Sequence, residues 1–384
     1  MPHVFAPPSL KRVSTSSDET TLIRIEHVDL SLVNALRRVI ISRIPNVGFV
    51  FDANDHSTEQ SIRVEQNDTP LHHEYVMHRI SLIPINLKTF DEIAEWDPSR
   101  YEFEINKVNE EGATMTHVTT KDFVVRDLQT NTLCPELAKR WFPPCPKTKD
   151  HILITKLYPK KHTAFCVKAT AYVHPPAFKA SFGIMSTCSF KNVVDEARAK
   201  EARAKLNGDE KALRVFDTMD VKRHYVVNDY GEPTVFEFKL VSACALSETD
   251  TFTRAFDVLL ELIATARANF VVEASQQADG SESTPIYHIR MTNATHTEGN
   301  LLQSILFNHV IRDQHPDVPT KMKECGLKYA GYTITHPLED CVVLKLIGKK
   351  LDTEQHARSF AEMTFDYVDS YVRGIKEEWI KNLS

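Results

Sequence analysis

The segment DLSLVNALRRVIISRIP, residues 29–45, carries the pattern that decides the fold. Asp29 or Ser31 can cap the start of a helix, and Pro45 closes it because proline cannot continue the backbone hydrogen-bond ladder. Apolar side chains recur at helical spacing along one face: Leu32, Ala35, Leu36, Val39, Ile40 and Ile44. The segment therefore predicts a short helix whose apolar face must pack against another element.

A second segment, THTEGNLLQSILFNHVIR at residues 295–312, repeats this pattern. We expect Thr297 to cap its helix. When Asn34 is aligned with Asn300, three pairs of apolar positions coincide: Leu36 with Leu302, Val39 with Ile305, and Ile40 with Leu306. A short alternating stretch precedes each helix, residues 21–25 and 286–291, so the sequence predicts a strand followed by a helix, twice.

Each repeat also closes with a strand followed by a long helix. The strands are expected at residues 234–242 and 341–347, and the helices at 251–268 and from about Thr353 onward. Both closing helices carry a wider apolar stripe than one sheet needs, so we expect the two halves to pack on each other. The residues predicted to form this packing are Leu36, Val39, Ile40, Phe256, Leu259, Leu302, Ile305, Leu306, Tyr367 and Tyr371.

The two repeats differ in the length between helix and closing strand. The second has ~30 residues there, enough for a hairpin, whereas the first has roughly 190, too many for a loop. We therefore expect a separate inserted domain at residues 86–228, mainly β because of its alternating runs. Its charged run at 192–214 predicts an exposed helix or helical loop, and the polar residues 273–285 predict a linker.

The predicted fold class is α+β: two small dimerisation halves, each a sheet with helices, packed as a pseudo-heterodimer within one chain. Residues 1–85 and 229–272 form the first half, and residues 286–384 form the second. The inserted domain projects from the first half.

Composition excludes several functions. The chain has 384 residues and a formal net charge of −6, and its 46 Lys and Arg residues are spread along the sequence. A protein that grips phosphates normally clusters its basic residues, so nucleic acid is expected to be held by other chains. No run of ~18 apolar residues predicts a membrane span, and the start of the sequence has no signal-peptide pattern.

No catalytic constellation is visible. The sequence has only 11 glycines, with no glycine-rich phosphate loop, no Gly-x-Ser-x-Gly, and no tight aspartate triplet that could bind paired Mg²⁺. His73 and His78 are five residues apart and so lie on different faces of a helix, which argues against a zinc pair. Two rival hypotheses stay open: a metal-dependent hydrolase that uses some of the 17 histidines, and a free-standing transcription regulator that binds DNA.

Several stretches resemble one family. LSLVNALRRVIISRIPNVGF, IRVEQNDTPLHHEYVMHRISLIPI and FEFKLVSACALSETDTFTRAFDVLLELI resemble the larger alpha-like chain of DNA-directed RNA polymerases that are built from many subunits, including its archaeal D-like form. The second repeat, with THTEGNLLQSILFNHV and AGYTITHPLEDCVVLKL, is similar to the smaller alpha-like chain, including its archaeal L-like form. In the inserted region, THVTTKDF, HILITKLYPKK and HPPAFKASFGIMSTCSF follow in the family's order.

The resemblance implies a non-catalytic assembly platform. In the family, the two alpha-like subunits are separate chains that form a heterodimer on which two large catalytic subunits assemble. Here both lie in one chain, so pairing is intramolecular and no homodimer is expected. The expected partners are the two large subunits and small assembly subunits, with DNA and RNA held only through the complex. Such a fusion resembles polymerases of large DNA viruses of eukaryotes, which implies the host cytoplasm or the virion, and otherwise the nucleus.

The resemblance also implies which residues contact the partners. The arginines that correspond to Arg37 and Arg38 face the large subunits in the family. The run LHHEYVMHRISLIPI implies a turn and helix whose polar groups Glu74, His78 and Arg79 contact one of the large subunits.

Many larger alpha-like subunits carry cysteine-based zinc or iron–sulfur sites in the inserted region. Here that region has Cys134, Cys145, Cys166 and Cys188, without paired spacing, and all seven cysteines are scattered as expected for reduced thiols. The sequence therefore predicts no metal and no cofactor in this chain.

Overall fold

The computed structural model describes residues 7–15, 20–52, 61–206, 208–275, 285–312, 315–336, 338 and 341–383. The chain divides into two compact units. Unit 1 contains Met1–Ile40, Thr187–Val241 and Thr249–Ser384, and unit 2 contains Ile41–Ser186 and Ser242–Glu248. Within the described residues, no helix is both long enough and apolar enough to span a membrane.

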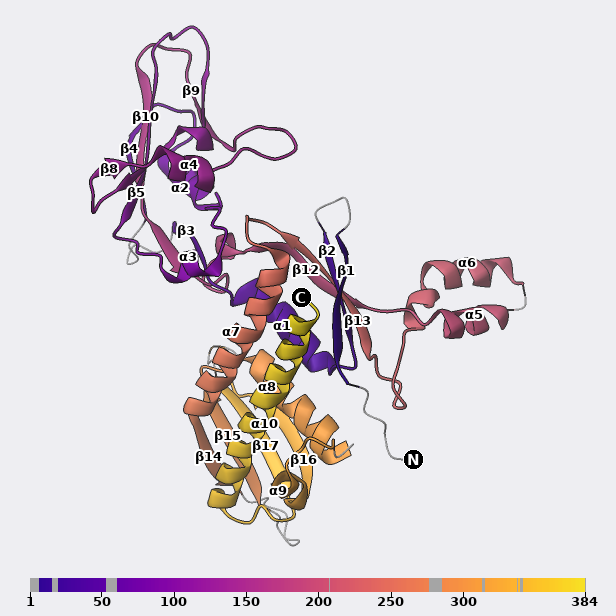
Figure 1. Cartoon of the computed structure of the whole chain (residues 1–384). Coiled ribbons are helices and arrows are strands. Elements are labelled where there is room, and N and C mark those ends of the chain that lie inside the picture. Colours follow the sequence, from indigo (N-terminus) through magenta and orange to yellow (C-terminus); the bar gives the residue numbers. More distant parts are fainter. Residues whose placement is uncertain are drawn as a thin grey trace. The chain divides into compact units, whose positions relative to one another are not determined.

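The first sheet of unit 1 has four strands in the order β1-β2-β13-β12 (Figure 1). Their bounds are β1 Ser9–Thr15, β2 Thr21–Glu26, β13 Val235–Ser242 and β12 Met185–Asn192. Helix α1, Leu30–Ser42, follows β2, and helix α7, Glu248–Ala268, follows β13. The predicted strand–helix pair at the start and the strand–helix pair at the close of the first repeat are both present.

The second sheet of unit 1 also has four strands, in the order β14-β15-β17-β16. Their bounds are β14 Phe270–Ser275, β15 Ile286–Thr292, β17 Cys341–Gly348 and β16 Leu327–Ile334. Helix α8, His296–Ile305, follows β15 and continues as a π-helix over Leu306–Arg312. The other helices that accompany this second sheet are α9, Thr320–Glu324, and α10, Glu354–Lys381.

The two sheets match position by position. In each, the strand before the first helix pairs with the closing strand, and a flanking strand lies on either side. Ile25 of β2 lies opposite Phe236 of β13, and Met291 of β15 lies opposite Val342 of β17. The alignment of Asn34 with Asn300 also places Ile25 on Met291, so the helix pattern and the strand register repeat together.

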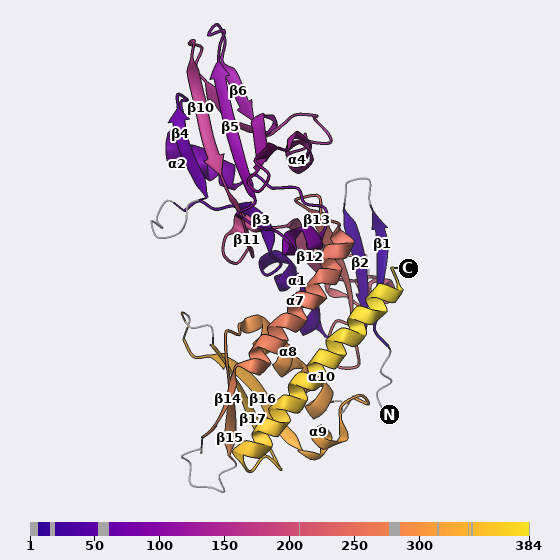
Figure 2. The ribbon, with the colours of Figure 1, turned by 60° about the vertical axis from the view of Figure 1, so that its left-hand side comes forward.

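The closing helices α7 and α10 run side by side in both views (Figures 1 and 2). The Trp379 indole Nε1 of α10 donates to the Thr253 hydroxyl of α7 at 2.9 Å, and its ring lies edge-on to Phe252, with centroids 5.0 Å apart. Near the other end of the contact, Arg267 pairs with Asp366 at 2.6 Å. The helices are therefore antiparallel, and unit 1 contains both repeats in one core.

Two details of unit 1 differ from the sequence prediction, and a third agrees with it. The cap of α8 is Thr295, not Thr297, because the Thr295 side chain accepts from the helix backbone while Glu298 bonds back to Thr295 in a capping box. The predicted linker begins inside a strand, since residues 273–275 belong to β14, and its residues 276–284 lie outside the described part of the chain. The prediction of an exposed helix in the charged run at 192–214 is confirmed, because this run contains α5 Glu196–Ala204 and the start of α6 Glu210–Thr218.

Unit 2 is mainly β, around a five-stranded sheet in the order β4-β10-β5-β7-β8. These strands are β4 Ile62–Asn67, β10 Thr163–Ala169, β5 Tyr101–Asn109, β7 Phe123–Asp127 and β8 Thr132–Leu133. Two strand pairs join β3 Asn46–Phe49 to β11 Ala171–His174, and β6 Thr116–Thr119 to β9 Leu153–Leu157. Its helices are α2 His73–Ser81, α3 Phe90–Ala94 and α4 Pro135–Trp141. Single 3₁₀ turns occur at Thr120–Asp122 and Ala180–Phe182, and in unit 1 at Asp220–Arg223.

The compact units do not share the predicted domain boundaries. Unit 2 includes residues 41–85, which the sequence assigns to the first half, and residues 187–228 lie in unit 1. A division by contacts in space need not follow the limits of an inserted segment in the sequence. Strand β12, for example, comes from the predicted insertion but belongs to the first sheet of unit 1. The division at residues 86–228 therefore stays a prediction. The mixed α+β class is confirmed by the antiparallel sheets and their helices.

Candidate assembly interface

Helices α1 and α8 lie together in unit 1, with their chain directions opposed. The Arg38 Nε, late in α1, donates to the Thr297 hydroxyl at the start of α8 at 2.9 Å. At the other end of the contact, the Ser304 hydroxyl of α8 donates to an Asp29 carboxylate oxygen at 3.0 Å, just before α1. The two contacts join equivalent ends of the two helices, as a pseudo-twofold arrangement requires.

The predicted packing residues lie almost entirely in the core. Nine of them are buried: Leu36, Val39, Ile40, Phe256, Leu259, Leu302, Ile305, Leu306 and Tyr367. Tyr371 is partly exposed, and its hydroxyl accepts from the backbone amide of Asp29 at 3.4 Å. Burial of the phenol, together with the nearby Asp29 carboxylate, raises the pKa of Tyr371, so this hydroxyl stays protonated. These positions are consistent with packing between the two repeats.

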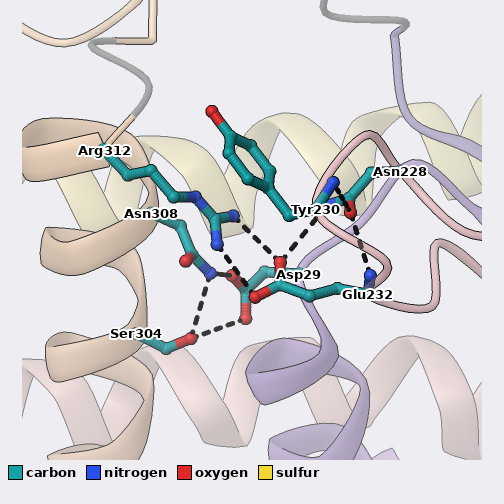
Figure 3. Close-up of polar contacts among 7 residues, drawn as sticks. All are labelled: Asp29, Asn228, Tyr230, Glu232, Ser304, Asn308 and Arg312. Carbon is teal, nitrogen blue, oxygen red and sulfur yellow. Dashed lines mark hydrogen bonds and ion pairs between the residues drawn. The ribbon is translucent and has the colours of Figure 1, made fainter.

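Asp29 is the centre of a polar cluster between the repeats (Figure 3). One carboxylate oxygen accepts from the Ser31 amide at 2.7 Å, which caps α1 as the sequence predicts. The same oxygen accepts from Ser304, and the other accepts from the Asn308 side-chain amide. Asp29 therefore holds the start of one helix and the end of the other with a single side chain.

Glu232 and Arg312 form a second polar contact between the repeats (Figure 3). The guanidinium donates two hydrogen bonds to the Glu232 carboxylate, at 2.8 and 2.9 Å. The Tyr230 ring covers it, with its centroid 4.0 Å from the guanidinium carbon. Asn228 fixes the turn that carries the carboxylate, because its side-chain oxygen accepts from the amides of Tyr230 and Glu232, each at 3.0 Å. Paired hydrogen bonds of this kind match the planar fork of arginine to a carboxylate.

His309 of the π-helix lies beside these contacts. Its Nδ1 is 2.8 Å from the Tyr367 hydroxyl, and its ring stacks on His315 with centroids 4.9 Å apart. A cavity of about 1120 Å³ opens here, lined by polar groups of both repeats together with Pro7, Pro8, Phe307 and Ile375. Burial raises the pKa of Tyr367.

The Glu232–Arg312 pair predicts a pH dependence of stability. The hydrogen bonds from Arg312 lower the pKa of Glu232 below its ordinary value of 4.5. A lowered folded-state pKa stabilises the fold above the unfolded-state value, and this stabilisation is lost as pH falls through the folded-state value. Because the Glu232 side chain is 48% exposed, we expect Glu232→Gln to cost about 1 kcal/mol or less at pH 7. Urea titrations should show this cost shrinking as pH falls below about 4.5; an equal cost at pH 7 and pH 3.5 would contradict it.

The two arginines predicted to face partners also bond within the chain. Arg37 donates to the Asn34 side-chain oxygen through Nε and Nη2, both at 3.0 Å, and is partly exposed. Arg38 is exposed in spite of its bond to Thr297. Exposure makes both accessible to a partner, and their predicted role stays a prediction.

Helix α2 of unit 2 carries the other three predicted contact residues, Glu74, His78 and Arg79, all exposed. Val76 and Ile80 bury the opposite side of the helix. An Arg79 Nη2 donates to the Leu153 carbonyl at 2.7 Å, which ties α2 to β9. Tyr75 and Leu82 add exposed apolar surface, 62% and 54% accessible. The exposed face of α2 therefore combines charged and polar side chains with exposed apolar ones.

Among the described residues, no group of three or more Cys, His, Asp or Glu side chains is placed to bind a metal ion. Cys188 is buried, and burial raises its pKa to about 12. Cys145 is exposed, and hydrogen bonds from Thr148 lower its pKa. The pKa values of these two thiols therefore shift in opposite directions, because one is buried and the other accepts hydrogen bonds at the surface.

Sequence reasoning missed Glu232, Asn308 and Arg312. The sequence contains no local signal for them, because Arg312 and Glu232 are 80 residues apart and Asn308 and Asp29 are 279 apart. Asp29 was identified, but only as a helix cap. The interface role of these residues is visible only once the two repeats are folded together.

The two four-stranded sheets and the helices between them make unit 1 an α+β domain built from two similar repeats. Residues 22–263 match the family described as RNA polymerase Rpb3/Rpb11 dimerisation domain. This match covers more than half of the chain, from β2 to α7 and including unit 2, so the chain belongs to that family. The second repeat lies beyond the matched residues.

Two curated relatives match short stretches. Subunit 3 of DNA-directed RNA polymerases II, IV and V from Arabidopsis thaliana is 31% identical over 74 residues, 19% of this chain and 20% of the relative. A conjugation stage-specific protein from Tetrahymena thermophila is 31% identical over 68 residues, 18% of this chain and 19% of the relative. The chain thus matches about a fifth of the length of each relative.

Proposed function

We propose that this chain is a non-catalytic assembly platform of a DNA-directed RNA polymerase, with the larger and smaller alpha-like subunits fused in one polypeptide. The observation that carries the proposal is the repeated sheet of unit 1: two four-stranded sheets with the same strand order and register, joined through α1, α8, α7 and α10. The family match and the Arabidopsis thaliana relative support the polymerase assignment.

The two repeats act together as a pseudo-heterodimer. Both α1 and α8 have a buried apolar face, and polar contacts join them at both ends, Arg38 to Thr297 and Ser304 to Asp29. The antiparallel α7 and α10 extend the joint. Because the two repeats are already folded together, a partner meets a rigid surface. Binding then does not lose free energy to the entropy cost of ordering that surface. Its partners are two large catalytic subunits and small assembly subunits, and DNA and RNA are bound by the complex. We place the protein where that polymerase works: the host cytoplasm or virion for a viral source, the nucleus otherwise.

Purification of the tagged chain from its native setting tests the platform role. Two very large chains that carry an aspartate-triplet motif should remain bound in moderate salt at near-equal stoichiometry. Recovery of the chain alone or with unrelated proteins would remove the polymerase assignment. Tight DNA binding by the isolated chain at physiological salt would instead favour the rival hypothesis of a free-standing regulator.

The exposed face of α2 gives a specific assembly prediction. The double variant Glu74→Lys and His78→Glu reverses the charge at the first position and adds a carboxylate at the second. It should lower recovery of the large subunits by about tenfold or more, because unpaired like charges at an interface cost a few kcal/mol. Both side chains are exposed, so the melting temperature should stay unchanged. Lys200→Glu, an equally exposed change on α5, is the matched control and should leave recovery intact. Full recovery with the α2 variant would dismiss this face as a contact.

Arg38 needs a different control because it also bonds to Thr297. Arg38→Glu removes that bond and reverses a surface charge, whereas Thr297→Val removes the bond alone. If Arg38 contacts one of the large subunits, Arg38→Glu should reduce recovery severalfold and Thr297→Val should not. Equal recovery of both variants would assign Arg38 to the joint between the repeats only.

A further inference from the structure

The helix pair α5 and α6 belongs to an arm, residues 195–224, that the platform role does not use. At the base of the arm, Val194 and Tyr225 form an antiparallel bridge, and the Asp195 amide donates to the His224 carbonyl at 2.8 Å. Figure 1 shows the two helices apart from both sheets of unit 1. The function of the arm is therefore to be sought on its own surface.

The arm is an ordered element with its own caps and contacts. Asp195 caps α5 and Asp209 caps α6, each by accepting two hydrogen bonds from backbone amides. Arg203 of α5 donates two hydrogen bonds to the Asp217 carboxylate of α6, at 2.8 and 2.9 Å. Phe216 is buried on the inner side of α6. The outer side of α6 is thus presented on a fixed backbone.

That outer side combines apolar and basic side chains in one exposed patch, which we call the α6 stripe: Lys211, Arg214, Val215 and Met219. Val215 and Met219 are 52% and 61% exposed, and they lie one turn apart on the same side, with the Met219 amide donating to the Val215 carbonyl at 2.9 Å. Lys211 lies one turn before Val215, and Arg214 borders the pair. Both cations are exposed, and neither forms an ion pair with another described residue.

The nearby carboxylates do not neutralise the stripe. Asp217 is held by Arg203, and Asp220 pairs with Arg223 at 3.0 Å. Glu210 lies in the first turn of α6, where the positive end of the helix dipole stabilises a carboxylate. The stripe therefore presents two cations beside two exposed apolar side chains, an arrangement complementary to an acidic and apolar surface.

We propose that the α6 stripe docks a short acidic segment of a partner protein, one that carries apolar side chains among its carboxylates. The carboxylates pair with Lys211 and Arg214, and the apolar side chains cover Val215 and Met219, whose flexible thioether adapts to their shape. The contact is small, so the complex is weak and exchanges quickly. This docking site goes beyond the platform role and does not depend on it.

The composition of the stripe favours a protein segment over nucleic acid. Surfaces that bind single-stranded nucleic acid combine a basic groove with aromatic rings on which bases stack. Here the side chains between the cations are aliphatic or thioether groups, and Phe216, the aromatic residue of α6, is buried. Exposed aliphatic side chains gain free energy when an apolar partner covers them, which a phosphate backbone does not do.

Fluorescence anisotropy with the full-length chain tests the docking site. The probe is a short labelled peptide in which leucines recur at helical spacing among glutamates. We expect it to bind, and to bind less tightly as salt rises. The same peptide with every leucine replaced by serine should bind at least severalfold more weakly, because it cannot cover Val215 and Met219. Single-stranded DNA of equal length should bind more weakly than the leucine peptide.

Two pairs of substitutions locate the binding on the stripe. Lys211→Glu with Arg214→Glu should raise the dissociation constant of the leucine peptide by about tenfold or more. Lys200→Glu with Lys205→Glu, on exposed positions at the other helix, changes the net charge equally and should alter it by about twofold or less. Val215→Ser with Met219→Ser should weaken binding by about fivefold or more without a change in charge. Circular dichroism should show unchanged helix content and melting for all three variants.

Several results would overturn the docking site: no binding of the leucine peptide, equal weakening by the two charge variants, or tighter binding of the DNA. Equal weakening would show attraction by overall charge, and tighter DNA binding would make the stripe a nucleic-acid site. The platform role is measured separately, by copurification of the large subunits. If those subunits fail to copurify while the stripe variants lose the peptide and the α5 control retains it, the platform role falls and the docking site stands.

Discussion

Replacing Trp379 with alanine should lower the free energy of unfolding of unit 1 by about 3–5 kcal/mol, the usual cost of deleting a fully buried large aromatic side chain. Trp379 is 0% exposed, lies edge-on to Phe252, and donates to Thr253. Thr253 keeps its own bond to the Thr249 carbonyl, so the main loss is packing rather than an unpaired hydroxyl. Chemical denaturation followed by far-UV circular dichroism would measure the change.

The neighbouring position provides the control. Ile380 follows Trp379 in α10 and is 46% exposed, so Ile380→Ala should change stability by about 0.5 kcal/mol or less. Trp379→Phe keeps a ring in the pocket and should fall between the two. A small effect of Trp379→Ala would mean that α7 and α10 do not depend on this contact, and the joint between the repeats would have to rest on α1 and α8.

The elements that sequence periodicity predicts are those with one continuous apolar face. Helix α1, the closing helices and the strands β2, β13 and β15 repeat or alternate over enough residues for the pattern to be recognised, and β17 is recognised as a short apolar run. The flanking strands β1, β12 and β14 were not predicted. The last three residues of β14, EAS at 273–275, were assigned to a linker because the stretch 273–285 is polar and contains glycine. Pairing with β15, not local sequence, makes this segment a strand.

The site was predictable in one respect and not in another. The apolar positions of α1 and α8 follow from helical spacing, since packing needs only a stripe of the right width. The polar contacts need particular atoms to meet, and Glu232 occupies a turn that no periodicity describes. The π-helix over Leu306–Arg312 could not be predicted either, because the sequence LFNHVIR looks the same whether the helix has α-helical or wider π-helical turns. Specificity in this joint thus depends on tertiary geometry that periodic patterns do not encode.

Replacing Phe103 with alanine should destabilise unit 2 by about 3–5 kcal/mol. Phe103 is 0% exposed in β5 and is surrounded by other rings, with Phe49 edge-on at 5.1 Å and Trp141 at 5.7 Å between centroids. Val124, on the neighbouring strand β7, is 39% exposed, so Val124→Ala is the matched control and should cost about 0.5 kcal/mol or less.

The tryptophans allow this effect to be read for unit 2 alone. The chain has three, and Trp96 and Trp141 lie in unit 2, within 6.4 Å and 5.7 Å of the Phe103 ring, while Trp379 lies in unit 1. In the Trp379→Phe variant, tryptophan fluorescence therefore reports on unit 2 alone. Phe103→Ala should lower the urea midpoint of this fluorescence transition. The part of the circular dichroism transition that belongs to unit 1 should keep its midpoint. Because α2 is anchored on unit 2 through Val76 and Ile80, the same variant should also weaken recovery of the large subunits near the midpoint. Recovery that persists after unit 2 has unfolded would show that α2 does not form the contact, and would leave the α1 arginines as the remaining candidates.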